Sequence, residues 1–104
     1  MSLKHDRFQS ALQEVAAEFI ERESDVKAII TVTHVETSGK GERAIVYYTV
    51  LPESFEEQVA ESLQKKRGDM REFLKTRLRL MRLPSFEFRL DKGEKNRQRI
   101  EDVI

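Results

Sequence analysis

Residues 54–90 read SFEEQVAESLQKKRGDMREFLKTRLRLMRLPSFEFRL, and this stretch decides the fold. Apolar residues recur every four positions in its first part, which predicts a helix over residues 54–67 that Gly68 interrupts. A second helix is then expected over residues 69–83, before Pro84. Each helix opens on a capping-box pattern, Ser54 with Glu57 and Asp69 with Glu72. The stretch therefore predicts two helices joined at a sharp change of direction.

Strict alternation follows Pro84. Phe86, Phe88 and Leu90 share one side of residues 85–90, and charged residues occupy the other. This period of two predicts a half-buried strand with both phenylalanines under the helices.

The N-terminal half supplies one more helix and a hairpin. Residues 6–23 carry apolar side chains at helical spacing. The β-branched residues 27–36 and residues 43–50 predict two strands around a turn at 38–42. The resulting order, α-β-β-α-α-β, predicts a two-layer α+β domain with a three-stranded sheet. We expect one domain over residues 1–90 and a polar tail over 91–104, which either lacks order or docks its last turn.

Composition excludes several classes of protein. The chain has 104 residues and no cysteine, which excludes disulfides, thiolate nucleophiles and cysteine-based zinc sites. No apolar run is long enough to cross a membrane, and no secretory signal is expected. Only His5 and His34 could serve as histidine bases, and no serine motif accompanies them. The turn at 38–42 lacks the spacing of a phosphate-binding loop. We therefore expect no enzyme, no metal, no cofactor and no small-molecule substrate.

Charge is divided between the two halves of a neutral chain. Residues 1–61 hold 6 basic and 12 acidic residues, whereas residues 62–99 hold 13 basic and 5 acidic residues. Such asymmetry favours an anionic partner for the basic half, although a solvated helix face would have the same composition.

The cations of the second predicted helix form a stripe. At about 100° per residue, four of them lie within about 80° of one another, opposite an apolar face that includes Met81. The stripe residues are Arg71, Lys75, Arg79 and Arg82. Lys65, Lys66 and Arg67 precede them, and such a line of cations is suited to following phosphates. Arg77 falls instead in the apolar arc, where it is expected to snorkel past the core or pair with a carboxylate.

The order and spacing of these pieces resemble the ribosome-binding factor A family of bacterial small-subunit assembly factors, from about Val26 to Ile104. The resemblance is carried by Ile30-Thr31-Val32-Thr33-His34-Val35, Ala44-Ile45-Val46-Tyr47-Tyr48, Leu63 through Gly68-Asp69-Met70-Arg71, and Leu78 through Phe88 with Asp91. It implies a KH-like fold of the second type, in which a helix-kink-helix built on an Ala-x-Gly motif replaces the Gly-x-x-Gly loop. Lys66-Arg67-Gly68 occupies that motif here, with lysine in place of alanine.

The resemblance also implies a function. It predicts a cytoplasmic, monomeric, non-enzymatic RNA-binding protein that associates with the immature small (30S) ribosomal subunit and assists maturation of 16S rRNA. Gly68 would set the angle between the helices. The predicted RNA-binding residues are Lys65, Lys66, Arg67, Gly68, Arg71, Lys75, Arg79 and Arg82. Two alternatives remain open: a helix-turn-helix DNA-binding protein, and a protein–protein adaptor that uses the acidic first helix.

Overall fold

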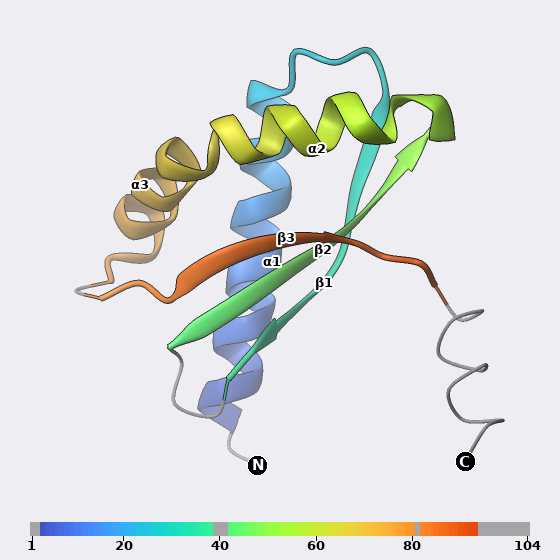
Figure 1. Cartoon of the computed structure of the whole chain (residues 1–104). Coiled ribbons are helices and arrows are strands. Elements are labelled where there is room, and N and C mark those ends of the chain that lie inside the picture. The colour runs from blue at the N-terminus through green and yellow to red at the C-terminus, as the bar shows by residue number, and fades with distance from the viewer. Residues whose placement is uncertain (1–2, 39–41, 81, 94–104) are drawn as a thin grey trace, which may run out of the picture.

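The computed structural model describes residues 3–38, 42–80 and 82–93. Its elements are α1 (Leu3–Glu23), β1 (Ile29–Thr37), β2 (Arg43–Leu51), the short 3-10 helix η1 (Glu53–Phe55), α2 (Glu56–Lys65), α3 (Arg67–Leu78) and β3 (Ser85–Leu90) (Figure 1). The predicted order is confirmed, and β3 has the predicted bounds. The predicted tail beyond residue 93 and the position of Met81 lie outside the described residues.

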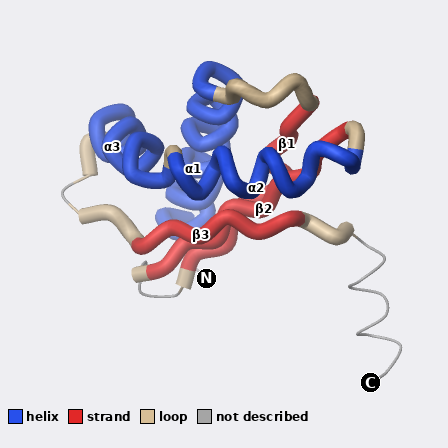
Figure 2. The backbone as a smooth tube through the Cα atoms, turned by 45° about the horizontal axis from the view of Figure 1, so that its top comes forward, coloured by secondary structure: helices blue, strands red, loops and turns tan. Residues whose placement is uncertain are grey.

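The three strands form one mixed sheet in the order β1-β2-β3. β1 pairs with β2 antiparallel, and β2 pairs with β3 parallel, so that Val46 lies between Val35 and Phe88. A parallel partner needs a long crossover, which α2 and α3 provide. Figure 2 shows the described helices on one face of the sheet. The α+β two-layer prediction is therefore confirmed.

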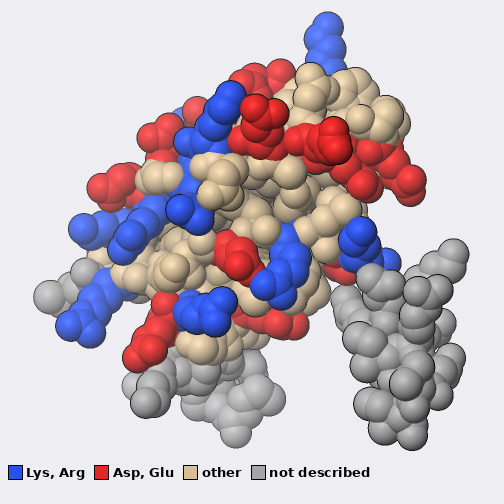
Figure 3. Space-filling model, in the orientation of Figure 1, with Lys and Arg blue, Asp and Glu red and all other residues tan. Residues whose placement is uncertain are grey.

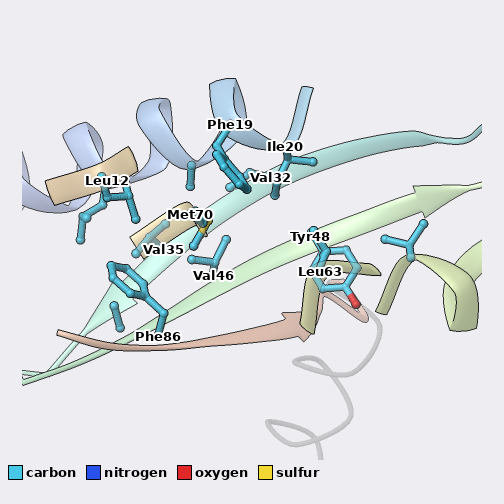
Figure 4. Packing of buried hydrophobic residues seen from close by; sticks show 14 of the residues in the cluster. Leu12, Phe19, Ile20, Val32, Val35, Val46, Tyr48, Leu63, Met70 and Phe86 are labelled. Carbon is cyan, nitrogen blue, oxygen red and sulfur yellow. The ribbon is translucent and has the colours of Figure 1, made fainter. Parts of the chain in front are cut away.

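The core lies between these two layers. Buried side chains from all three helices and all three strands meet there (Figure 4). The largest fully buried ones are Leu12, Val46, Val59, Met70 and Leu74. Phe86 is buried as predicted, whereas Phe88 is only half-buried at the edge of the cluster.

The kink between α2 and α3 is at Lys66, two residues before the predicted break. Lys66 has φ −95° and ψ 4°, and the chain becomes helical again at Arg67. Gly68 lies within the first turn of α3 without a positive φ, so it does not set the angle through glycine's special conformations. The capping-box predictions were also wrong, since no side chain caps η1, α2 or α3.

Helix α3 ends at Leu78, five residues before the predicted end. Arg79 adopts a left-handed conformation with φ 53°, and the amide of Leu80 donates to the carbonyl of Lys75 at 3.2 Å. The chain must reverse there to place β3 beside β2, and Ser85 donates its amide to the carbonyl of Glu42 at 2.9 Å. Tertiary pairing thus overrides the helical periodicity of residues 79–83.

Replacing Gly68 by alanine should stabilise the protein by about 0.5–1 kcal/mol. A helical alanine loses less backbone entropy on folding than glycine. A Cβ atom placed at Gly68 would meet nothing within 4 Å, so no contact opposes the gain. Urea unfolding of the two proteins measures the difference. A loss of stability would mean that the kink needs a glycine here after all.

Candidate nucleic-acid interface

A cationic groove lies between α3 and the segment that leads to β3. It has a volume of about 420 Å³ and is lined by Gly68, Arg71, Glu72, Lys75, Arg82 and Leu83. Arg71 and Lys75 are one helical turn apart and both are exposed. Arg82 joins them because the chain turns back after Arg79. Figure 3 shows Lys and Arg side chains gathering at the left, over α3.

The three cations of this groove are available to a ligand. Within the described part of the chain, no ion pair or side-chain hydrogen bond engages Arg71, Lys75 or Arg82. Glu72 is the one carboxylate among the residues that line the groove and reduces its positive charge. The N-terminus of α3 adds backbone amides that no side chain caps. The groove therefore offers charge and hydrogen-bond donors suited to phosphate oxygens.

Lys66 has a structural partner instead. Its Nζ donates to the carbonyl of Glu23 at the end of α1 and lies 3.7 Å from Oδ2 of Asp25. Ser62 of α2 donates its hydroxyl to Oδ1 of the same carboxylate at 2.9 Å. The kink is thereby tied to the C-terminus of α1. The partners are about forty residues away in sequence, which is why periodicity could not reveal this role.

The remaining predicted residues separate into two groups. Lys65 lies 3.8 Å from Glu61 in an exposed pair one turn apart, and such pairs add little stability. Arg67 and Arg79 are exposed but do not line the groove. Arg79 leaves the predicted stripe because the helix has already ended. Leu83 and Glu72 line the groove although the sequence did not mark them as site residues.

Arg77 pairs with a carboxylate, as one of the two sequence interpretations expected. Its guanidinium hydrogen-bonds Glu18 of α1, with one donor at 2.6 Å, and lies 5.1 Å from the ring centre of Phe73. Arg22 of α1 approaches the same ring at 5.5 Å. These contacts join α3 to α1 and fix which face of α3 is turned outward.

His34 lies on the sheet face away from the helices and stacks on Tyr47 with ring centres 4.3 Å apart. Its Nδ1 lies 3.8 Å from Asp91 and its Nε2 lies 3.6 Å from Glu36. Among the described residues, no group of three or more potential ligands is placed to hold a metal ion. No described helix is both long and apolar enough to cross a membrane.

The pKa of Asp25 is lowered below its ordinary value of 3.8, chiefly by the Ser62 hydrogen bond, then by its own backbone amide and the charge of Lys66. Because the folded pKa is depressed, ionised Asp25 stabilises the fold above pH 3.8, and this contribution is lost as the pH falls through the folded pKa. We expect Asp25→Asn to reduce the loss of stability on acidification below pH 3.8.

Chemical unfolding of both proteins across that pH range measures the effect. Glu14→Gln is the matched control, because Glu14 is exposed and outside this contact. An identical acid response in the Asp25→Asn protein and the wild type would contradict the assignment.

The fold and the groove define a small α+β protein whose helix-kink-helix carries a group of exposed cations. Comparison with known proteins identifies the family. The model of the family "Ribosome-binding factor A" matches residues 4–104. The chain therefore belongs to the ribosome-binding factor A family.

Individual relatives agree with this assignment. Ribosome-binding factor A of Macrococcus caseolyticus is 31% identical, over 100% of this chain and 94% of the relative. The corresponding protein of Corynebacterium diphtheriae is 30% identical over 94% of this chain and 71% of the relative. The crystal structure of ribosome-binding factor A from Thermus thermophilus aligns with a TM-score of 0.74 at 28% identity, covering 83% of this chain and 94% of that one.

A further structural relative was placed in a ribosomal complex. It is a homology model of the Thermus thermophilus factor fitted into a cryo-electron microscopy map of its complex with the 30S subunit. It aligns with a TM-score of 0.72 at 28% identity and covers 82% of this chain and 92% of that one.

Proposed function

We propose that this protein is a non-enzymatic RNA-binding assembly factor that associates with the immature 30S subunit in the cytoplasm and assists maturation of 16S rRNA. Family membership and the relative fitted into a 30S complex support the ribosomal partner. The observation that carries the RNA-binding role is the groove in which Arg71, Lys75 and Arg82 converge without partners among the described residues.

The positions of the cations in the groove favour one kind of RNA over another. Its three cations come from two segments, so they favour a phosphate path that bends around α3 rather than a straight duplex. Sequence-specific RNA recognition uses such irregular or single-stranded elements, whose bases are accessible. Arg71, Lys75 and Arg82 would contact phosphates, Gly68 would allow the backbone to approach, and Arg67 and Arg79 would add charge at the margins.

Lys65 and Lys66 take different parts in this proposal. The exposed Lys65 adds to the positive field near the kink. Lys66 acts through its attachment to α1, which positions α3, and is a positioning residue rather than a phosphate ligand.

Sedimentation of a bacterial lysate in a density gradient tests the proposed partner. The protein should travel with free 30S subunits and their precursors as a single copy, and should be absent from the 70S fraction. Competition with duplex DNA separates this function from the helix-turn-helix alternative. RNA from the small subunit should displace the protein far better than duplex DNA of equal length, and the opposite order would contradict the proposal.

A further inference from the structure

β1 is an edge strand, and α1 covers only part of its free edge. In the part from Thr33 to Thr37, two glutamines of α1 hydrogen-bond two of the outward backbone groups. Gln13 donates to the carbonyl of Thr33 at 3.2 Å, and Gln9 accepts from the amide of Thr37 at 3.0 Å. This half of the edge is therefore blocked to another strand.

The other half of β1 faces a groove. The groove has a volume of about 470 Å³ and lies between the C-terminal part of α1 and residues 24–32. The backbone carbonyl of Tyr48 points toward β3, where it accepts a hydrogen bond from the amide of Asp91 at 2.7 Å. Val32 is the antiparallel partner of Tyr48 in β1, and because Tyr48 points its backbone groups away from β1, Val32 points its own away from β2. Ile30 is two residues before Val32 in the strand, so its backbone groups also point away from β2. In the described structure, no hydrogen bond from α1 reaches these two residues.

The lining of this groove combines apolar side chains with polar groups, and most of its residues are apolar. The lining side chains are Ala17, Ile20, Glu21, Ser24, Val26, Ala28, Ile29, Ile30, Thr31 and Val32. Ile29 pairs across the sheet with Leu51, and these side chains are 68% and 59% exposed. A strand added beside Ile30 would direct alternate side chains into the groove and the others toward Ile29.

The α1 side of the groove carries carboxylates, and Glu21 is part of the lining. Glu14 and Glu21 are two turns apart and lie within about 20° of each other on the arc of α1 that carries Ala17. Both are exposed, and within the described residues neither takes part in an ion pair. Glu18, by contrast, is neutralised by Arg77. These two carboxylates of α1 attract cationic side chains and repel phosphates.

We propose that the edge of β1 at residues 29–32 accepts an extended peptide segment of another protein, in which apolar residues alternate with lysine or arginine. The segment would extend the sheet through the amides and carbonyls of Ile30 and Val32, which is the β-augmentation mode of peptide recognition. Its apolar residues would fill the groove, and its cations would pair with Glu14 and Glu21. This inference goes beyond RNA binding, because the two grooves have no residue in common and carry opposite charge.

The test uses a synthetic peptide of about seven alternating valine and lysine residues, a typical strand length, and its counterpart with glutamate in place of lysine. We expect the lysine peptide to bind and to slow hydrogen exchange of the Ile30 and Val32 amides at least tenfold. The glutamate peptide should leave both amides unchanged. Equal binding of the two peptides, or protection confined to other amides, would overturn the proposal.

Variants locate the site. Glu14→Lys with Glu21→Lys should weaken binding of the lysine peptide at least tenfold, whereas Glu53→Lys with Glu57→Lys, an equal charge change at exposed positions elsewhere, should not. If both pairs of substitutions weakened binding of the lysine peptide equally, the proposed location of the site would be wrong. Arg71→Glu with Lys75→Glu changes the cationic groove and should leave peptide binding intact. The peptide proposal can therefore fail or hold independently of the RNA-binding proposal. A further outcome concerns the protein without any peptide. If the Ile30 and Val32 amides then become protected from hydrogen exchange as the protein concentration rises, the edge pairs with a second copy of the chain and the proposal is overturned.

Discussion

Replacing Arg71 and Lys75 together by glutamate should weaken binding to small-subunit ribosomal RNA about a hundredfold at low salt. A hydrogen bond to a charged group contributes about 1.5–3 kcal/mol, and each 1.4 kcal/mol is about tenfold in affinity, so two lost contacts account for at least this factor. The slope of log affinity against log salt should also become shallower by about 1.4–1.8. Both side chains are exposed and unpaired among the described residues, so the fold should be retained.

Lys27→Glu with Arg43→Glu is the matched control. It makes the same change in net charge at two exposed positions outside the α3 groove. General electrostatic attraction would fall equally in both double variants, whereas direct phosphate contact would change the salt slope only in the Arg71 and Lys75 variant. Equal slopes for the two variants would leave the groove without a role in RNA binding.

Sequence patterns predicted the elements best where local and tertiary preferences agree. Residues 85–90 alternate strictly after Pro84, and their observed strand matches in sheet face and bounds. Helix α3 shows the opposite case. The periodicity of residues 79–83 favoured a helix, but Arg79 adopts a left-handed cap that is rare outside glycine and asparagine. The need to place β3 beside β2 decides this position, and that requirement is not local.

The same distinction applies to the candidate site. Arg71 and Lys75 share the groove because residues four apart on one helix share a face, which the sequence shows directly. Arg82 lies in the groove for a different reason from the one predicted, since a turn and not a helix brings it there. Lys66 was predicted as an RNA ligand because it belongs to a basic run. Its contact with Glu23 and Asp25 depends on how α1 packs, so charge patterning alone could not assign it.

Phe86→Ala should cost about 3–5 kcal/mol of stability, the usual range for a buried phenylalanine. Phe86 is 5% exposed and enters the core from the beginning of β3, just after Pro84. Total stability of a domain this size is about 5–15 kcal/mol, so the loss removes a large fraction of it. The same strand follows Arg82 and Leu83, and its anchoring therefore also holds one wall of the cationic groove in place.

Phe88→Ala provides the comparison, because it removes the same side chain from the same face of β3. Phe88 is only half-buried and meets Tyr48 edge to face, with ring centres 6.5 Å apart. Less apolar surface returns to water when it is truncated, so its cost should be roughly half that of Phe86→Ala. Urea unfolding of the two variants measures the difference. A cost for Phe88→Ala equal to or above that of Phe86→Ala would show that Phe88 is covered more completely than Phe86, contrary to the observed burial.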